Sequence, residues 1–235
     1  MRSILVVPAA SPSFAAALAS EADAFAIDLA VPGDAQAARR AATEMLAAAK
    51  AAGKIRLAMI HPLATGLADA DLDAVMTAAP DGIVLPDATG GRDVQHLGAK
   101  LAVREAENDL ADGSTRILAL AADSPAAIFE LGSLARAARR LIGIGRDERR
   151  LCERLGLAWP LVGDEPEPLR VARGLVVLAA AAAGAPAFDS AEPGEGEAYA
   201  RACARAARDG FSGKFALTPD QALRINAAFA GVRRS

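Results

Sequence analysis

The chain has 235 residues, and 26 Lys and Arg residues against 29 Asp and Glu residues give it a formal net charge of −3. Because no block of like charge could follow a phosphate backbone, we expect no nucleic-acid partner. Hydrophobic residues make up 53% of the chain and aromatic residues only 4%, so aliphatic side chains must fill the core of what we expect to be a single domain over residues 1–235.

Two apolar segments resemble targeting or membrane segments, and both are interrupted. Pro8 ends the first apolar run soon after it begins, which argues against a secretory signal. Residues 174–188 are shorter than the roughly 20 residues that a membrane span needs, and they contain Gly184 and Pro186. Cys152 and Cys203 are far apart and form no CxxC pair. We therefore expect a cytoplasmic protein without membrane contact.

Short apolar runs alternate with longer segments rich in Ala, Leu and Arg along the whole chain, a pattern typical of βα units on a parallel sheet. The predicted strands are residues 4–7, 24–27, 56–60, 82–85, 117–120, 141–144, 185–188 and 215–217. The predicted helices are residues 14–20, 35–52, 69–77, 94–107, 125–138, 169–183, 199–208 and 219–229. Eight such units predict a (β/α)₈ TIM barrel.

The last predicted helix has the clearest start signal in the chain. Thr218 stands at the cap position, Pro219 at the first helical position and Gln221 three residues after the cap. The segment at residues 191–196 follows the seventh predicted strand, so it should lie on the active-site face, where it could act as a lid.

Polar or chain-turning residues follow almost every predicted strand, at positions that meet on one rim of a barrel, where such enzymes place their chemistry. These residues are Pro8, Asp28, His61, Asp87, Asp123, Asp147 with Glu148, Asp189 and Thr218. Residues of these types also begin helices as caps, and carboxylates at strand ends also pair with neighbouring arginines. The pattern alone therefore predicts a barrel with an acidic rim.

Several segments in register along the chain resemble the citrate lyase beta-subunit and HpcH/HpaI aldolase family. They are Arg2-Ser3-Ile4-Leu5-Val6-Val7-Pro8, residues 22–29 with Val31-Pro32-Gly33-Asp34, residues 81–86, residues 123–129, Phe188-Asp189, residues 209–214 and Thr218-Pro219-Asp220-Gln221. The resemblance implies a barrel of the phosphoenolpyruvate/pyruvate type and a homo-oligomer, either a trimer or a hexamer.

The resemblance also implies a Mg²⁺-dependent carbon–carbon lyase acting on a CoA thioester or a small oxo or hydroxy acid. In such enzymes the cation is held by carboxylates after the fifth and sixth strands, and these positions fall on Asp123 and Glu148. Mg²⁺ prefers carboxylate oxygens and stabilises enolate charge as a Lewis acid. We assign Arg2, in the matched opening segment, to cofactor binding.

This chain departs from the family pattern at several rim positions. The family has Glu and Asp where Asp123 and Glu148 stand, so the carboxylate lengths are exchanged. Met59-Ile60-His61 replaces an Arg-x-Asn pattern, which removes the guanidinium that stabilises the enolate. Asp87 stands where a Lys is usual. New catalytic roles are therefore expected for His61, Asp28 and Asp87.

Two hypotheses follow from these observations. In the first, the chain is a divergent Mg²⁺-dependent lyase with Asp123 and Glu148 as metal ligands. In the second, it is a catalytically degenerate barrel that serves as a ligand-binding or oligomeric scaffold, since a fold can persist after its chemistry is lost. A dinucleotide site is excluded because Glu148 replaces the third Gly of the fingerprint, and an esterase-type hydrolase is excluded because the chain has no GxSxG.

Overall fold

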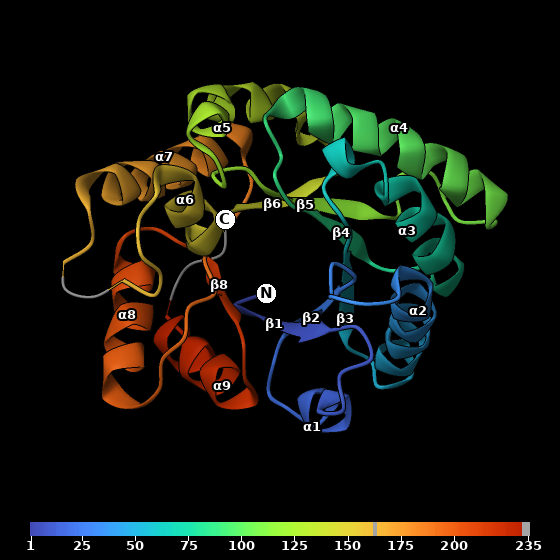
Figure 1. The fold of residues 1–235 in the computed structure, drawn as a ribbon, viewed down its shortest axis with the longest axis horizontal. Coiled ribbons are helices and arrows are strands. Elements are labelled where there is room, and N and C mark those ends of the chain that lie inside the picture. The colour runs from blue at the N-terminus through green and yellow to red at the C-terminus, as the bar shows by residue number, and fades with distance from the viewer. Residues whose placement is uncertain (162–163, 232–235) are drawn as a thin grey trace.

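The computed structural model describes residues 1–161 and 164–231. Within them, eight parallel strands pair in sequence order and close into a barrel (Figure 1). The strands are β1 (Ser3–Pro8), β2 (Ala24–Asp28), β3 (Ile55–Met59), β4 (Gly82–Leu85), β5 (Arg116–Leu120), β6 (Leu141–Gly145), β7 (Ala187–Asp189) and β8 (Gly213–Ala216). The predicted TIM barrel is confirmed.

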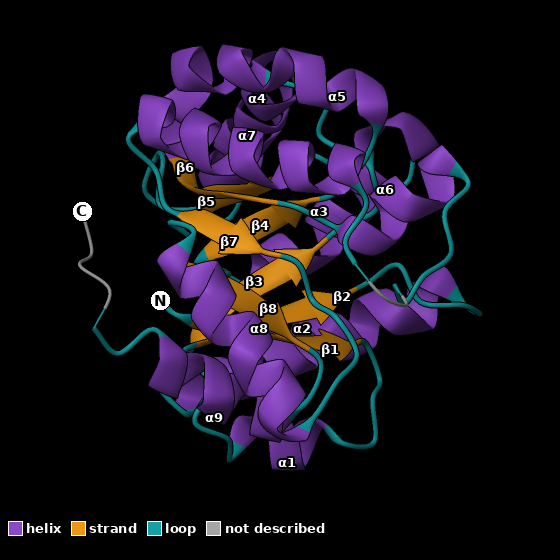
Figure 2. Cartoon of the chain, turned by 90° about the vertical axis from the view of Figure 1, so that its left-hand side faces the viewer, coloured by secondary structure: helices purple, strands orange, loops and turns teal. Residues whose placement is uncertain are grey.

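Helices surround the barrel (Figures 1 and 2). They are α1 (Phe14–Leu18), α2 (Ala35–Ala51), α3 (Ala68–Val75), α4 (Gly91–Glu107), α5 (Pro125–Glu130), α6 (Glu148–Leu155), α7 (Glu167–Ala183), α8 (Gly196–Arg208) and α9 (Pro219–Ala228). Short 3-10 segments lie at η1 (Leu63–Thr65), η2 (Met76–Ala78) and η3 (Leu131–Arg140). The structure adds α6, which was not predicted. It also corrects the helix predicted over residues 125–138, which continues as 3-10 turns beyond Glu130.

Aliphatic side chains and two phenylalanines from alternate strand positions fill the barrel interior, as the side-chain period of two on a strand requires. Its buried members are Ile4, Ala24, Ala26, Leu57, Val84, Leu118, Leu120, Phe188 and Phe215. Phe188 and Phe215 meet edge to face, with their ring centroids 6.4 Å apart. The interior is therefore a packed core rather than a channel.

The glycines of β6 make room for these rings. A Cβ atom on Gly143 would lie 2.4 Å from Cε2 of Phe188, and one on Gly145 would lie 2.7 Å from Cδ2 of Leu120. The Gly143-Ile144-Gly145 pattern therefore serves close packing inside the barrel.

Ion pairs hold the amino ends of the strands together. Arg2, just before β1, binds both carboxylate oxygens of Asp23, just before β2, at 2.7 and 3.0 Å. Arg56 and Asp81 repeat this arrangement between β3 and β4, at 3.1 Å for both contacts. Arg2 therefore lies at the end of the barrel opposite the rim, a placement that does not fit its predicted role in cofactor binding there.

The start of α9 has the predicted capping residues. The Thr218 hydroxyl accepts a hydrogen bond from the Gln221 amide at 3.2 Å, while the Gln221 carboxamide oxygen accepts one from the Leu217 amide at 2.7 Å. The Gln221 side chain also donates to the carbonyls of Glu192 and Gly194, at 3.1 and 2.9 Å. These bonds attach the segment at residues 191–196 to α9, so a lid function for that segment remains a prediction.

Within the described residues, every helix is too short or too polar to span a membrane.

Candidate functional site

A small cavity of about 180 Å³ opens at the carboxyl ends of the strands, which we call the barrel mouth. It is lined by Val6, Asp28, Met59, Leu120, Arg146, Asp147, Arg149, Trp159, Ser190, Ala191, Phe215 and Leu217. Two acidic and two basic side chains thus face a cavity with an apolar floor. This is the end of the barrel where we expected a site.

Asp123, three residues beyond the end of β5, is completely buried. Its two oxygens accept hydrogen bonds from the backbone amides of Asp87, at 3.0 Å, and Asp147, at 2.9 Å. Burial, together with the nearby negative charge of Asp147, holds the pKa of the Asp123 carboxyl well above its usual range. Asp123 therefore joins the loops after β4, β5 and β6.

Glu148, at the start of α6, is paired with an arginine. Its carboxylate forms a short ion pair with the guanidinium of Arg146, and both side chains are buried. The Arg146 Nε atom in turn donates to Asp189 Oδ1 at 2.8 Å. Burial disfavours the charged guanidinium, but the carboxylates of Asp189 and Glu148 outweigh it and raise the pKa of Arg146. Glu148 is thus neutralised by a permanent cation.

This arrangement does not fit the predicted Mg²⁺ site. Mg²⁺ needs near-octahedral oxygen ligands with positions left for water or substrate. Asp123 is bonded to backbone amides and Glu148 to an arginine, and no cluster of three or more His, Cys, Asp or Glu side chains in residues 1–161 and 164–231 could hold a metal ion. The rim therefore offers a fixed guanidinium where a metal was expected.

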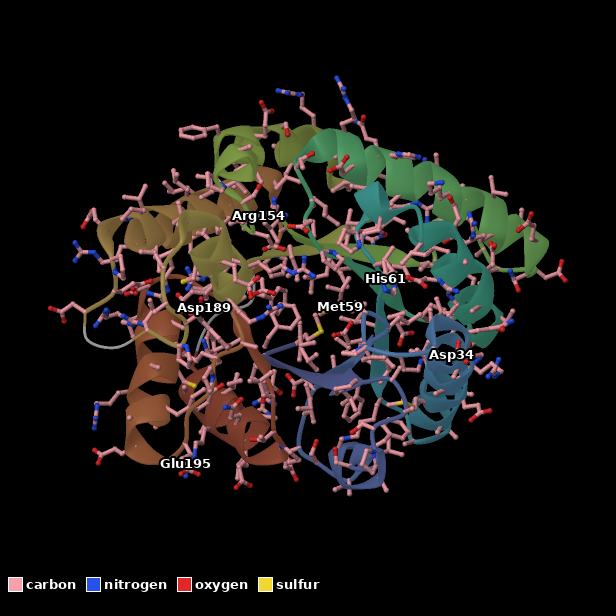
Figure 3. The ribbon with its side chains drawn as sticks, viewed as in Figure 1. Asp34, Met59, His61, Arg154, Asp189 and Glu195 are labelled. Carbon is pink, nitrogen blue, oxygen red and sulfur yellow. The ribbon has the colours of Figure 1, made fainter. Side chains whose placement is uncertain are left out.

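Asp28 ends β2 with its side chain at the barrel mouth. One of its oxygens accepts a hydrogen bond from the Ala30 amide at 2.9 Å. Burial raises its pKa, although the nearby cations oppose this effect. Met59, two residues before His61, also lines the mouth and lies near the centre of the ring of strands in Figure 3. A thioether here supplies no charge to an enolate.

His61 lies beyond β3 and is bound to an acidic residue of α3. Its Nδ1 atom is 2.7 Å from Asp71 Oδ2, which also accepts a hydrogen bond from the His61 amide at 2.8 Å. The fully buried Asp71 carboxylate pairs on its other oxygen with Arg39 at 2.8 Å. This orients the imidazole, but His61 is not among the residues that line the mouth.

Asp87 sits in a turn with a positive φ of 52° and pairs with two arginines of α6. Its carboxylate lies 2.8 Å from Arg150 and 3.4 Å from Arg154. Figure 3 labels Arg154. Asp87 thus connects the loop after β4 to α6, and its side chain is not a mouth-lining group.

The structure brings together some predicted residues and adds others that the sequence did not indicate. Asp28 reaches the mouth, and Asp123 lies beneath the loops beside it, whereas Arg2 lies at the other end of the barrel. Arg146 is the main addition. The sequence signal was a basic residue between the β6 glycines and two acids, but nothing in the sequence shows which carboxylates it meets.

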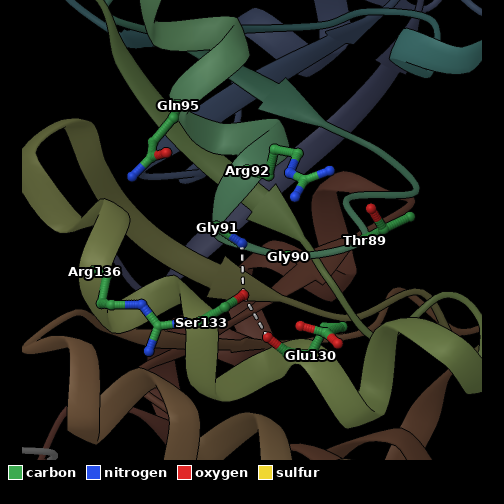
Figure 4. A pocket seen from close by; sticks show the side chains of 8 residues that line it. All are labelled: Thr89, Gly90, Gly91, Arg92, Gln95, Glu130, Ser133 and Arg136. Atoms are coloured by element: carbon green, nitrogen blue, oxygen red, sulfur yellow. Dashed lines mark hydrogen bonds between the residues drawn. The ribbon is translucent and has the colours of Figure 1, made fainter.

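A second hollow lies outside the barrel, between the start of α4 and η3 (Figure 4). The Gly91 amide donates to the Ser133 hydroxyl at 2.8 Å, and this hydroxyl donates to the Glu130 carbonyl at 2.6 Å. Arg92 and Arg136 flank these bonds, but the first amide of the helix already has its acceptor. This hollow contains none of the predicted site residues.

The chain is similar in sequence to known proteins over most of its length. A profile of the HpcH/HpaI aldolase/citrate lyase family matches residues 2–219. The citrate lyase subunit beta of Haemophilus influenzae is 29% identical over 177 residues, which are 74% of this chain and 60% of that protein. The chain thus covers less than two thirds of this relative.

Solved structures show the same fold. RipC from Yersinia pestis is 25% identical, with a TM-score of 0.76 over 99% of this chain and 98% of that one. The citrate lyase beta subunit from Mycobacterium tuberculosis is 23% identical, with a TM-score of 0.80 over 98% of this chain and 97% of that one. Both likenesses span nearly the whole barrel.

Proposed function

Because the chain belongs to the HpcH/HpaI aldolase/citrate lyase family, we propose that its barrel mouth binds a small oxo or hydroxy acid without a Mg²⁺ ion held by Asp123 and Glu148. The observation that carries this proposal is the buried ion pair of Glu148 with Arg146. Separating such a pair in a buried site is costly, because it leaves an uncompensated charge. A cation at Glu148 would have to overcome that cost.

The ligand class is supported by the size of the cavity and by structural relatives. The citrate lyase beta subunit of M. tuberculosis has been solved with magnesium and oxaloacetate, and the related CitE protein from that organism with magnesium and either acetoacetate or pyruvate. A cavity of about 180 Å³ is smaller than the roughly 300–1,000 Å³ typical of drug-sized ligands. It suits an acid of a few carbon atoms, or only the acyl end of a CoA thioester.

The rim favours binding over metal-assisted carbon–carbon cleavage. Met59 provides no positive charge for an enolate, and the two expected metal ligands are separately bonded. In enzymes, removing a single preorganised hydrogen-bond donor that stabilises charge in the transition state lowers the rate roughly 10²–10³-fold. This supports the hypothesis of a ligand-binding barrel that has lost its Mg²⁺-dependent chemistry.

A second candidate function is metal-independent lyase activity with Asp28 as the proton acceptor. It is favoured by one observation, a half-buried carboxylate at the mouth whose pKa is raised by desolvation, a shift in the direction that favours a general base. Cleavage that persists in EDTA and is abolished by Asp28→Asn would support this candidate.

Thermal unfolding with a panel of small acids tests the main proposal. Pyruvate, lactate, oxaloacetate and acetoacetate are each added to the purified chain in EDTA or in excess MgCl₂, and NMR follows the acids for cleavage. We expect at least one acid to raise the melting temperature equally in both buffers, without Mg²⁺-dependent product. Stabilisation or turnover that requires Mg²⁺ would overturn the proposal.

A further inference from the structure

Arg146 has a buried hydrogen-bond donor that the protein itself does not satisfy. The residue follows β6 directly, its side chain is 4% exposed, and it lines the barrel mouth. Nε donates to Asp189 and Nη2 to Glu148, but Nη1 is buried and has no partner within residues 1–161 and 164–231. A buried donor on a charged group is costly to leave unpaired, so this atom calls for an acceptor.

The guanidinium is held in place by a network that extends into the layer between the barrel and the helices. Asp189, which accepts from Arg146 Nε, also binds Arg173 Nη2 at 3.1 Å and lies 3.6 Å from Lys214 Nζ. Lys214 Nζ donates to the Ser190 carbonyl at 2.6 Å. A third carboxylate, Glu165, lies with its Oε1 atom 4.0 Å from Arg146 Nη2. All these side chains are buried, so the guanidinium is held among three carboxylates.

We propose that Arg146 takes the place of a metal cation in this barrel and binds the carboxylate of the small acid through Nη1. This inference rests on the proposed function and names the group that performs it. A guanidinium presents planar, fixed donors that match a carboxylate, and its charge is permanent.

The other charges of the mouth narrow the ligand class. Asp28 and Asp147 line the same cavity, and its second arginine, Arg149, forms an exposed ion pair with Glu153 at 2.6 Å through Nη1. A second carboxylate on the ligand would therefore meet like charge. We infer that monocarboxylic 2-oxo or 2-hydroxy acids bind more tightly than dicarboxylic acids.

The experiment compares Arg146→Lys with a matched control, Arg140→Lys. Both arginines are buried and pair with a buried carboxylate, but Arg140 binds Glu105, is not a mouth-lining residue and, among the described residues, has no contact with the Arg146 network. Isothermal titration with pyruvate is performed on each protein, with thermal unfolding as a check of folding. We expect Arg146→Lys to raise the Kd for pyruvate roughly 10–100-fold, because one charge-assisted hydrogen bond is lost, and Arg140→Lys to leave it unchanged.

The outcomes separate this inference from the proposed function. If the wild-type protein binds pyruvate and Arg146→Lys binds it equally well, acid binding stands and the role of Arg146 is overturned. If the wild-type protein binds no acid of the panel, both proposals fail. Should Arg146→Lys not fold, a crystal structure of the wild-type protein with pyruvate decides: a carboxylate oxygen within hydrogen-bond distance of Nη1 supports the inference, and pyruvate bound elsewhere overturns it.

Discussion

Asp123 shows how one buried carboxylate connects separate loops of the rim. It accepts two backbone amides from separate loops while the protein keeps it away from solvent. Its position shortly after a strand could be predicted from the sequence, because only Ala121 and Ala122 separate it from the end of β5. Its partners could not, since they come from loops whose approach depends on the closed barrel.

Replacing Asp123 by Asn should have an effect on stability that depends on pH. Burial, with the charges of Asp147 and Asp87, raises the pKa of Asp123 in the folded protein, so the folded state binds the proton more tightly. The stability due to this group is complete below its unfolded pKa of about 3.9 and is lost as pH rises through the folded value. Asn does not titrate. At acidic pH we expect Asp123→Asn to lower the free energy of unfolding by roughly 1–3 kcal/mol, because the carboxamide cannot accept from both backbone amides. This loss should shrink as pH rises.

Urea unfolding of both proteins at several values between about pH 5 and pH 9 measures this difference. A difference in the free energy of unfolding that stays constant, or grows with pH, would show that Asp123 ionises normally in the folded protein.

Arg2→Ala separates the predicted cofactor role of Arg2 from the ion pair that the structure shows. Arg2 binds Asp23 at the amino ends of β1 and β2, and its side chain is 31% exposed. We expect the free energy of unfolding to fall by about 1 kcal/mol, the upper range for partly exposed pairs. The affinity for pyruvate, measured by titration calorimetry, should stay unchanged, and a weakened affinity would instead connect Arg2 to the ligand.

At the level of elements, the sequence predicted the strand order well because each short apolar run lies between longer helical patterns. It missed α6, where Arg and Glu residues leave only Leu151, Cys152 and Leu155 as apolar side chains. It also extended α5 over residues 131–138, since helical and 3-10 turns share nearly the same apolar spacing. The pairing of Glu148 with Arg146 depends on how α6 begins, so missing that helix also hid this contact.

Gly143→Ala tests the close packing of β6 against β7. The new Cβ atom would lie 2.4 Å from the Phe188 ring, so the ring or the strand must shift. Such overpacking costs roughly 1–3 kcal/mol, and we expect a lower melting temperature. Gly174→Ala is the control, because Gly174 is an exposed residue of α7 with nothing within 4 Å of its Cβ position. That change should be neutral or stabilising; equal losses for both variants would contradict the packing argument.

At the scale of the whole molecule, we expect the trimer or hexamer to form through an exposed apolar surface of α7. Val171, Leu175 and Leu178 are exposed by 50%, 37% and 66%, and their spacing places them on one side of the helix. Light scattering should give a mass of three or six chains, and Leu178→Glu should lower it. Leu223→Glu, which changes an exposed leucine of α9, should not. A monomeric wild-type protein would rule out this oligomer.

The central claim is that a guanidinium, and not a metal ion, provides the positive charge of the barrel mouth. A crystal structure of the wild-type protein grown with pyruvate and MnCl₂ tests it directly, since anomalous scattering locates manganese without reference to any assumed site. We predict pyruvate in the mouth beside Arg146 and no manganese between Asp123 and Glu148. A manganese peak coordinated by both carboxylates, with the Glu148–Arg146 pair broken, would contradict the account.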